Sequence, residues 1–165
     1  MRGWLKKMKQ KIYLETSVVS YFVSRPSKNI VIAGRQAVTK DMWDTMDDYD
    51  VFISDIVIQE SSKGDAKFAK LRLDAVEKYN ILKIDDEAKE LAKLLIQRKS
   101  IPAEYPEDAL HISIAAVNGI DVVVTWNFKH LNNPATRISI RKVMEMNGYI
   151  CPEICSPDEF LGDEI

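Results

Sequence analysis

The segment from Ala109 to Thr125 limits the fold of this 165-residue chain more than any other. Residues 109–117 are apolar nearly all round a predicted helix, which indicates that this helix is deeply buried. Gly119 ends the helix, and residues 121–125 then form a strand rich in β-branched side chains. Such a strand beside a buried helix is typical of a central strand in a parallel sheet that helices cover on both faces. We therefore predict an α/β fold.

Strand and helix patterns alternate along the rest of the chain as well. We predict strands at residues 11–14, 51–53, 81–84, 121–125 and 149–154. We predict helices at residues 18–23, 29–47, 68–79, 85–99, 107–117 and 140–147, and helices that start near residues 55 and 157. This alternation predicts a three-layer α/β/α sandwich with a central parallel sheet.

Length and composition indicate one globular domain. A chain of 165 residues is about the size of one domain and can bury a substantial core. Hydrophobic residues make up 46% and charged residues 29%, and the longest apolar stretch is far shorter than a membrane span. We expect residues 1–10 to be a basic N-terminal extension and residues 11–165 to be a single domain. The extension has no apolar core of signal-peptide length, so we expect a cytoplasmic protein without membrane association.

Charge and cysteine content argue against two kinds of site. The net charge is −2, so the chain lacks the overall basic surface of many nucleic-acid-binding proteins, and any such contact must be local. The basic residues of the N-terminal extension could supply one, or the extension could be dispensable. Cys151 and Cys155 have no histidine near them, so a zinc site lacks ligands and we expect reduced structural thiols.

Four polar residues stand at separate boundaries between predicted elements. They are Glu15 after the first strand, Glu60 and Asp108 early in two helices, and Asn127 beyond the strand at residues 121–125. The carboxyl ends of parallel strands meet at one edge of a sheet, so these residues can gather there. Crowded carboxylates repel one another unless a cation or shared protons separate them. The sequence therefore predicts a divalent metal site held by Glu15, Glu60 and Asp108.

Oxygen ligands of this kind favour Mg²⁺ or Mn²⁺, whereas zinc prefers sulfur and imidazole. Such an ion can polarise a phosphodiester and activate water, so phosphodiester hydrolysis is the natural reaction. The hydroxyl groups of Thr16 and Ser17 follow the first strand and could bind a phosphate or a metal-bound water. Lys129 and His130 follow Asn127 and are plausible substrate contacts.

Each of these positions also has a purely structural interpretation. Acidic residues favour the first turn of a helix because of the helix dipole, so Glu60 or Asp108 taken alone is weak evidence for a metal site. For Lys129 and His130 the structural interpretation is stronger still. His111 lies inside the apolar helix, where a hydrogen-bonded core histidine is more frequent than a ligand or a general base.

Other chemistries lack their sequence signatures. The chain contains no G-x-x-x-x-G-K-[ST] segment, no G-x-G-x-x-G after a strand and no G-x-S-x-G turn. The sequence thus gives no support to a nucleotide-cofactor enzyme or a serine hydrolase.

Three segments, together with the early Glu60, resemble the PIN-domain nucleases. They are Ile12-Tyr13-Leu14-Glu15-Thr16-Ser17, Glu107-Asp108-Ala109-Leu110-His111-Ile112 and Thr125-Trp126-Asn127-Phe128-Lys129-His130-Leu131. The resemblance spans nearly the whole chain and is greatest to the VapC-like branch, which occurs in bacterial and archaeal toxin–antitoxin pairs. It implies helices around a parallel sheet, dependence on Mg²⁺ or Mn²⁺, and hydrolysis of single-stranded or structured RNA.

The resemblance also implies roles for individual residues. The family's acidic positions correspond to Glu15, Glu60 and Asp108, its fourth polar position corresponds to Asn127, and its hydroxyl-bearing neighbours correspond to Thr16, Ser17 and Thr125. The partners that the resemblance implies are RNA, an antitoxin protein whose peptide covers the acidic groove, and a second copy of the chain in a homodimer.

Two departures from the family pattern leave two functions open. Glu15 stands where aspartate is usual, and its extra methylene adds about 1.5 Å of reach. Asn127 stands where aspartate is frequent, which lowers the charge of the site and weakens a second ion more than the first. The first function is a metal-dependent endoribonuclease, the toxin of a toxin–antitoxin pair. The alternative is a non-catalytic PIN-fold module that binds RNA or protein and has an eroded metal site.

Overall fold

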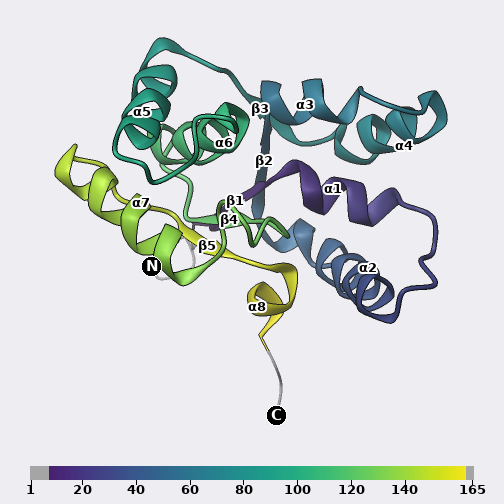
Figure 1. Cartoon of the computed structure of the whole chain (residues 1–165). Helices are drawn as coiled ribbons and strands as arrows, with labels where there is room; N and C mark the ends of the chain where they lie inside the picture. The colour runs from purple at the N-terminus through teal and green to yellow at the C-terminus, as the bar shows by residue number, and fades with distance from the viewer. Residues whose placement is uncertain (1–7, 163–165) are drawn as a thin grey trace, which may run out of the picture.

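The computed structural model describes residues 8–162, and its strands form one parallel sheet (Figure 1). The strands are β1 (Lys11–Leu14), β2 (Asp50–Ser54), β3 (Asn80–Leu82), β4 (Val122–Val124) and β5 (Glu153–Cys155). Their order across the sheet is β3-β2-β1-β4-β5, and each neighbouring pair is parallel. Residues 1–7 of the expected N-terminal extension lie outside the described residues, so the division into an extension and one domain stays a prediction.

Helices cover both faces of the sheet, which confirms the predicted α/β/α sandwich (Figure 1). One layer contains α1 (Thr16–Val23), α2 (Ile30–Trp43), α3 (Asp55–Ser61) and α4 (Ala66–Val76). The other layer contains α5 (Asp86–Gln97), α6 (Pro106–Val117) and α7 (Pro134–Met146). The short helix α8 (Pro157–Leu161) packs against α2. Among the described residues, no helix has the length and apolar character needed to cross a bilayer.

Strand β1 lies at the centre of both the sheet and the core. Ile12, Tyr13 and Leu14 are fully buried, because β1 pairs with β2 on one side and with β4 on the other while helices cover both faces. From β1 the chain proceeds outward to β2 and β3, and it then returns to β4 on the opposite side of β1. This reversal is a topological switch point, where parallel sheets form a ligand crevice beyond the carboxyl ends of the strands.

The segment from Ala109 to Thr125, from which we predicted the α/β fold, lies at the centre of the structure. Helix α6 is buried on nearly all sides, as its apolar sequence predicts. Gly119 follows it with φ of +68°, a left-handed conformation that favours glycine and ends the helix. Strand β4 lies between β1 and β5, so the prediction of a central strand is confirmed.

Several predicted boundaries were wrong. Helix α7 starts at Pro134, six positions before the predicted start at residue 140, because the Asn133 side chain accepts the N–H of Thr136 and caps the helix. The helix predicted at residues 29–47 ends at Trp43, and a short 3₁₀ helix (Met46–Asp48) follows. Two strands also differ from their predicted ranges. Strand β3 covers Asn80–Leu82 instead of residues 81–84. Strand β5 covers only Glu153–Cys155 instead of residues 149–154, because only these three residues pair with β4.

The two cysteines are free thiols, as the sequence indicated. Burial raises the pKa of Cys151 to about 11 and that of Cys155 to about 12. Thiols with such pKa values are protonated near neutral pH and are therefore poor nucleophiles and poor metal ligands.

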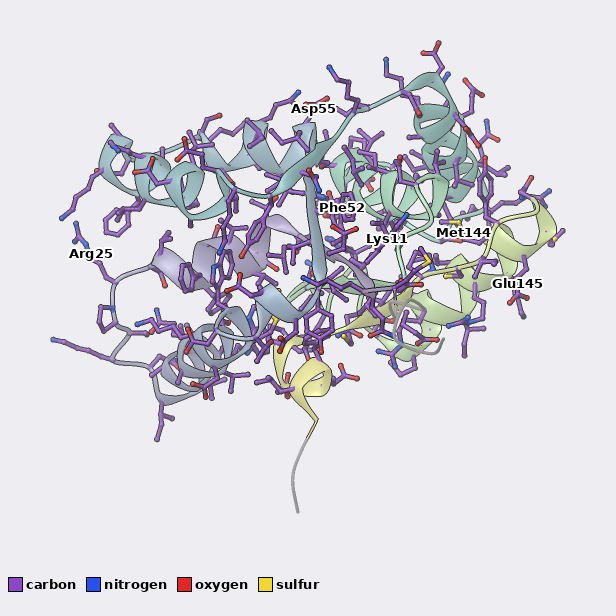
Figure 2. The ribbon with its side chains drawn as sticks, turned by 180° about the vertical axis from the view of Figure 1, so that it is seen from behind. Lys11, Arg25, Phe52, Asp55, Met144 and Glu145 are labelled. Carbon is purple, nitrogen blue, oxygen red and sulfur yellow. The ribbon has the colours of Figure 1, made fainter. Side chains whose placement is uncertain are left out.

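The parallel register places the predicted site residues at one edge of the sheet. Lys11 at the start of β1 pairs with Asp50 at the start of β2, so both strands end at the same edge. Asp55, the first residue of α3, follows the end of β2, and Figure 2 labels it together with Lys11, the first residue of β1. Glu15 and Thr125 directly follow the ends of β1 and β4 at the edge that carries Asp55.

We expect Leu95→Ala to lower the free energy of unfolding by about 2–5 kcal/mol, because truncating a buried leucine leaves a cavity. Leu95 is fully buried on α5, the helix that packs against α6. Leu71→Ala is the matched control, since the Leu71 side chain is 41% exposed, and it should cost less than about 1 kcal/mol. Urea denaturation followed by circular dichroism measures both losses. Equal losses would contradict this packing.

Candidate active site

Glu15 connects strand β1 to helix α1 and is only 5% exposed. Its N–H donates to the carbonyl oxygen of Val124 at 3.1 Å, which joins the end of β1 to the end of β4. Its carboxylate accepts the N–H of Ser17 at 3.0 Å, the hydroxyl of Ser17, and the hydroxyl of Thr125 at 2.6 Å. Glu15 is therefore a buried carboxylate held in place at the switch point of the sheet, and it also caps α1.

Glu60 approaches Glu15 from helix α3. The hydroxyl of Ser54 caps this helix by accepting the N–H of Val57 at 3.3 Å, which sets the start of α3 directly after β2. The Oε1 atom of Glu60 lies 2.7 Å from the hydroxyl of Thr16, which donates to it, and 2.6 Å from Nε2 of His111. Two different elements, α1 and α6, thus hold this carboxylate.

His111 is the site residue that the sequence analysis did not select. It is fully buried and hydrogen-bonded, as expected of a core histidine, but its Nε2 atom also lies 3.9 Å from Oε2 of Glu15. The imidazole therefore stands between two carboxylates. One signal in the sequence could have revealed it: His111 follows Asp108 by three positions on α6, and residues with this spacing share a helix face.

The His111–Glu60 pair shifts the pKa values of both partners. Burial by itself would raise the pKa of Glu60, but the hydrogen bond and charge of His111 bring that pKa below its usual value. Burial would lower the pKa of His111, but the hydrogen bond to Glu60 and the charges of Glu15 and Glu60 bring it above its usual value. Both directions have the same cause, because the hydrogen bond between the two side chains favours the charged form of each partner.

Asp108 lies in the first turn of α6 with its side chain mostly buried. Its Oδ2 atom is 2.9 Å from Nδ1 of His130, and the ring of Tyr105 packs against that histidine with centroids 3.9 Å apart and an angle of 33° between the rings. Burial and the charge of Glu15 raise the pKa of Asp108, although hydrogen bonds from Asn127 and His130 act in the opposite direction. The charge of Glu15 therefore acts on Asp108, and we refer to Glu15, Glu60 and Asp108 together as the acidic cluster.

Asn127 and Lys129 follow strand β4 in the same turn. The N–H of Asn127 donates to the hydroxyl of Thr125 at 2.9 Å, and its side-chain oxygen accepts the N–H of His130 at 3.0 Å. The half-buried Asn127 thereby orders the turn that carries His130 to Asp108. Lys129 is exposed on the outside of this turn.

The structure brings two of the three predicted metal ligands together most closely. Among residues 8–162, Glu15, Glu60 and His111 offer ligand atoms that all lie within 4.8 Å of one another. Asp108 is outside this group. Glu15 and Glu60 would therefore be the residues that hold a divalent ion through their carboxylate oxygens. Crowded, hard carboxylate oxygens of this kind fit a small divalent ion.

The hydroxyl groups that were predicted as substrate contacts are directed to carboxylates in this structure. The hydroxyl of Thr16 donates to Glu60, and those of Ser17 and Thr125 donate to Glu15. Each hydroxyl has a single hydrogen to donate, so in this arrangement it orients a carboxylate. Contact between these hydroxyl groups and a substrate stays a prediction.

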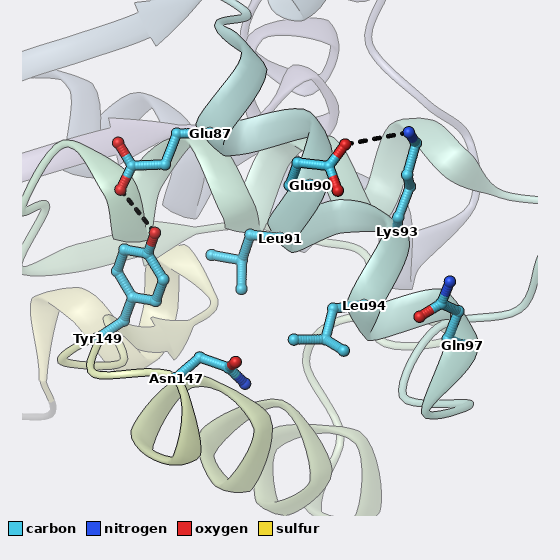
Figure 3. Close-up of a pocket in the computed structure, with 8 residues that line it drawn as sticks. All are labelled: Glu87, Glu90, Leu91, Lys93, Leu94, Gln97, Asn147 and Tyr149. Atoms are coloured by element: carbon cyan, nitrogen blue, oxygen red, sulfur yellow. Dashed lines mark hydrogen bonds and ion pairs between the residues drawn. The ribbon is translucent and has the colours of Figure 1, made fainter.

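A separate pocket of about 350 Å³ lies between α5 and the end of α7 (Figure 3). Two of its carboxylates already have partners: Glu87 accepts the hydroxyl hydrogen of Tyr149 at 2.6 Å, and Glu90 forms an ion pair with Lys93 at 3.1 Å. Because its two carboxylates already bind separate partners, this pocket differs from the site where Glu15 and Glu60 meet.

The PIN domain family matches residues 12–132, which is more than half of the chain. This chain belongs to the PIN-domain family. The matched segment of this PIN domain runs from β1 to the turn after β4, so it includes Glu15, Glu60, Asp108 and Asn127.

Two solved structures are similar to this PIN domain. VapC20 of Mycobacterium tuberculosis, described as a toxin that cleaves the sarcin-ricin loop, has a TM-score of 0.55 and 14% identity, over 84% of this chain and 96% of that chain. VapBC2 of Rickettsia felis, bound to a DNA fragment from its promoter, has a TM-score of 0.55 and 17% identity, over 90% of this chain and 100% of that chain. At these identities the similarity shows the fold. No curated protein sequence matches significantly.

We expect Thr125→Val to lower the free energy of unfolding by about 1–3 kcal/mol, because it removes a hydrogen-bond donor from the buried carboxylate of Glu15. Urea denaturation in EDTA measures this loss. Thr136→Val is the control, since the Thr136 hydroxyl makes no hydrogen bond among residues 8–162, and it should change stability by less than about 0.5 kcal/mol. A Thr125 variant as stable as the control would show that this hydroxyl does not hold Glu15.

Proposed function

We propose that this PIN domain is a metal-dependent endoribonuclease, a hydrolase that acts as the toxin of a toxin–antitoxin pair. The observation that supports this most is the meeting of Glu15 and Glu60 at the switch point of the sheet, with ligand atoms within 4.8 Å of each other. The resemblance to PIN-domain nucleases supports RNA as the substrate. The description of VapC20 as a toxin that cleaves the sarcin-ricin loop supports the same reaction.

In this proposal Glu15, Glu60 and Asp108 hold one Mg²⁺ or Mn²⁺ ion. When bound, such an ion polarises the phosphodiester and supplies an activated water as the nucleophile. Ser17 and Thr125 hold Glu15 in a single orientation through their hydrogen bonds. Glu15 therefore needs little rearrangement before the reaction, which lowers the entropic cost of catalysis.

The turn after β4 supplies the proposed contacts to RNA. Asn127 orders this turn and orients water or substrate, and the exposed charge of Lys129 is available to a phosphate of the RNA backbone. His130 connects the turn to Asp108 at 2.9 Å. The hydroxyl groups of Thr16, Ser17 and Thr125 are further proposed contacts, in addition to their bonds to the carboxylates.

The extra methylene of Glu15 has a structural use. A glutamate at this position reaches back to accept the N–H of Ser17 and so caps helix α1 while it also accepts the Thr125 hydroxyl. The longer side chain is thus fixed by three hydrogen bonds rather than left mobile. This ordering supports Glu15 as a working ligand despite its departure from the usual aspartate.

We also propose an antitoxin protein as partner, whose peptide covers the acidic groove, and a homodimer in the cytoplasm. The description of VapBC2 bound to a DNA fragment from their promoter supports an antitoxin partner, and the resemblance to VapC-like proteins supports the homodimer. Light scattering after size-exclusion chromatography tests the homodimer, and co-purification with the product of the neighbouring reading frame tests the antitoxin.

We expect the parent protein to cleave a mixed fluorescent RNA pool with Mn²⁺ or Mg²⁺, and EDTA to stop the cleavage. Asp108→Asn should slow cleavage by at least about 100-fold, because it removes a charged ligand. Asp74→Asn is the control, since Asp74 forms only an exposed pair with Lys70 on α4, and it should cleave like the parent.

An Asp108→Asn variant that cleaves as fast as the parent would refute the proposed active site. Failure of the parent to cleave, together with RNA or protein binding that ignores EDTA, would instead favour the non-catalytic module. The neutral side chain of Asn127 is the observation that favours this alternative, because it lowers the charge available to a second ion.

We expect Mn²⁺ to stabilise the folded protein, because an ion that binds only the native state shifts the unfolding equilibrium. At a concentration of about 100 times its dissociation constant, the gain is about 2.7 kcal/mol. Thermal unfolding with Mn²⁺ and then with excess EDTA measures the gain and its reversal. Glu60→Gln should reduce the gain, whereas Asp74→Asn should keep it. An equal gain in all three proteins would place the ion elsewhere.

A further inference from the structure

A chain of buried hydrogen bonds leads from the core of the sheet to Glu60. The hydroxyl of Tyr13 lies 2.7 Å from Oγ of Ser54 and 2.6 Å from Nδ1 of His111. Nε2 of His111 lies 2.6 Å from Oε1 of Glu60. The chain connects β1, β2, α6 and α3, and Tyr13, Ser54 and His111 are fully buried. These three side chains are therefore too deep to contact RNA themselves.

Tyr13 leaves His111 little freedom. It anchors one ring nitrogen of the histidine, and its own ring stands edge-on to the imidazole with centroids 5.8 Å apart. Because the imidazole is rigid, anchoring Nδ1 within a packed core also sets the position of Nε2 on the opposite side of the ring. Ser54 in turn contacts the Tyr13 hydroxyl and caps α3, the helix that carries Glu60.

Glu60 has much more freedom than the residues that hold it. Its side chain is 29% exposed and rotates about several bonds, so ordering its carboxylate costs conformational entropy. Among the described residues, its hydrogen-bond partners are Thr16 and His111, and both contact the same oxygen, Oε1. Removing His111 would leave Thr16 as the single hydrogen-bonded restraint on this carboxylate.

We propose that His111, held by Tyr13 and Ser54, is a positioning residue that orients the carboxylate of Glu60 toward Glu15 for binding a divalent ion. This inference rests on the proposed function in one respect, because it takes Glu60 to be a metal ligand. His111 is fully buried, and burying a polar ring costs free energy unless both nitrogens are hydrogen-bonded. Residues that orient a metal ligand commonly raise metal affinity by about 10–100-fold.

Two substitutions at His111 separate positioning from packing. The amide of asparagine lies near the place of Nδ1, so His111→Asn keeps a partner for Tyr13 but loses Glu60. The amide of glutamine reaches the place of Nε2, so His111→Gln can still donate to Glu60. We expect His111→Asn to weaken Mn²⁺ binding by about tenfold or more, and His111→Gln to stay within about threefold of the parent. Isothermal titration calorimetry with MnCl₂ measures both affinities.

The role through Glu60 is tested by repeating His111→Asn in a Glu60→Gln background. If His111 acts by orienting Glu60, the substitution should change Mn²⁺ affinity little in that background. Tyr149→Phe is the control, because it removes a tyrosine hydroxyl that donates to a glutamate in the separate pocket, and it should leave Mn²⁺ affinity unchanged. Equal weakening by asparagine and glutamine, or an undiminished effect in the Glu60→Gln background, would overturn the proposal.

A measurement without metal gives a second readout. In the parent, the Nε2–H of His111 should give a slowly exchanging proton resonance in NMR spectra, because it is buried and donates to Glu60. Glu60→Gln should shift or remove this resonance, and so should Tyr13→Phe, whereas Tyr149→Phe should leave it in place. A resonance unchanged in both Glu60→Gln and Tyr13→Phe would also overturn the proposal.

These outcomes are distinct from failure of the proposed function. A parent that binds Mn²⁺ with the expected dependence on residue 111 but cleaves no RNA would refute the endoribonuclease and keep the positioning role. A parent that cleaves RNA while its Mn²⁺ affinity ignores residue 111 would refute the positioning role alone. A parent that binds no Mn²⁺ would refute the positioning role for a divalent ion.

Discussion

The parallel pairing of β1 with β4 is the constraint on which the site depends. It places Glu15 beside Thr125, whose hydroxyl donates to the Glu15 carboxylate. The backbone N–H of Glu15 also donates to the carbonyl oxygen of Val124 and so joins the ends of the two strands. The chain leaves β1 for β2 and returns to β4, so the helices that follow or precede these strands converge at the same edge. Glu60 and Asp108 approach this edge from α3 and α6. A different strand order would separate residues that are far apart in the sequence.

Bringing these carboxylates together creates an electrostatic cost that the surrounding residues reduce. Hydroxyl groups of α1 and of the residue after β4 donate to Glu15 and Glu60, and His130 contacts Asp108. The imidazole of His111 lies next to the two glutamates, and its hydrogen bond to Glu60 and the charges of both glutamates raise its pKa. Fold and chemistry are therefore linked: the buried core of β1 and α6 supplies the partners that make a crowded acidic site tolerable.

Much of the fold was accessible from the sequence, because it depends on local patterns. The β-branched strand after a buried helix predicted the central position of β4, and apolar runs predicted β1 and β2. The start of α7 was predicted too late although Asn133 and Pro134 form a recognisable helix start, and β5 is short because its length depends on pairing with β4. Two of the four polar boundary residues, Glu15 and Glu60, meet in one group in the structure, together with His111, which was treated as an ordinary core residue.

The sequence by itself determined the type of fold, the PIN-domain resemblance and the positions of the acidic residues at element boundaries, because these follow from periodicity, capping and local motifs. The tertiary structure decided that His111 and Glu60 share a hydrogen bond, that Tyr13 anchors His111, and that hydroxyl groups of Thr16, Ser17 and Thr125 orient the carboxylates. These contacts join residues as many as 110 positions apart. Only the packing of strands and helices brings such residues within hydrogen-bond distance, and no local pattern in the sequence records that distance.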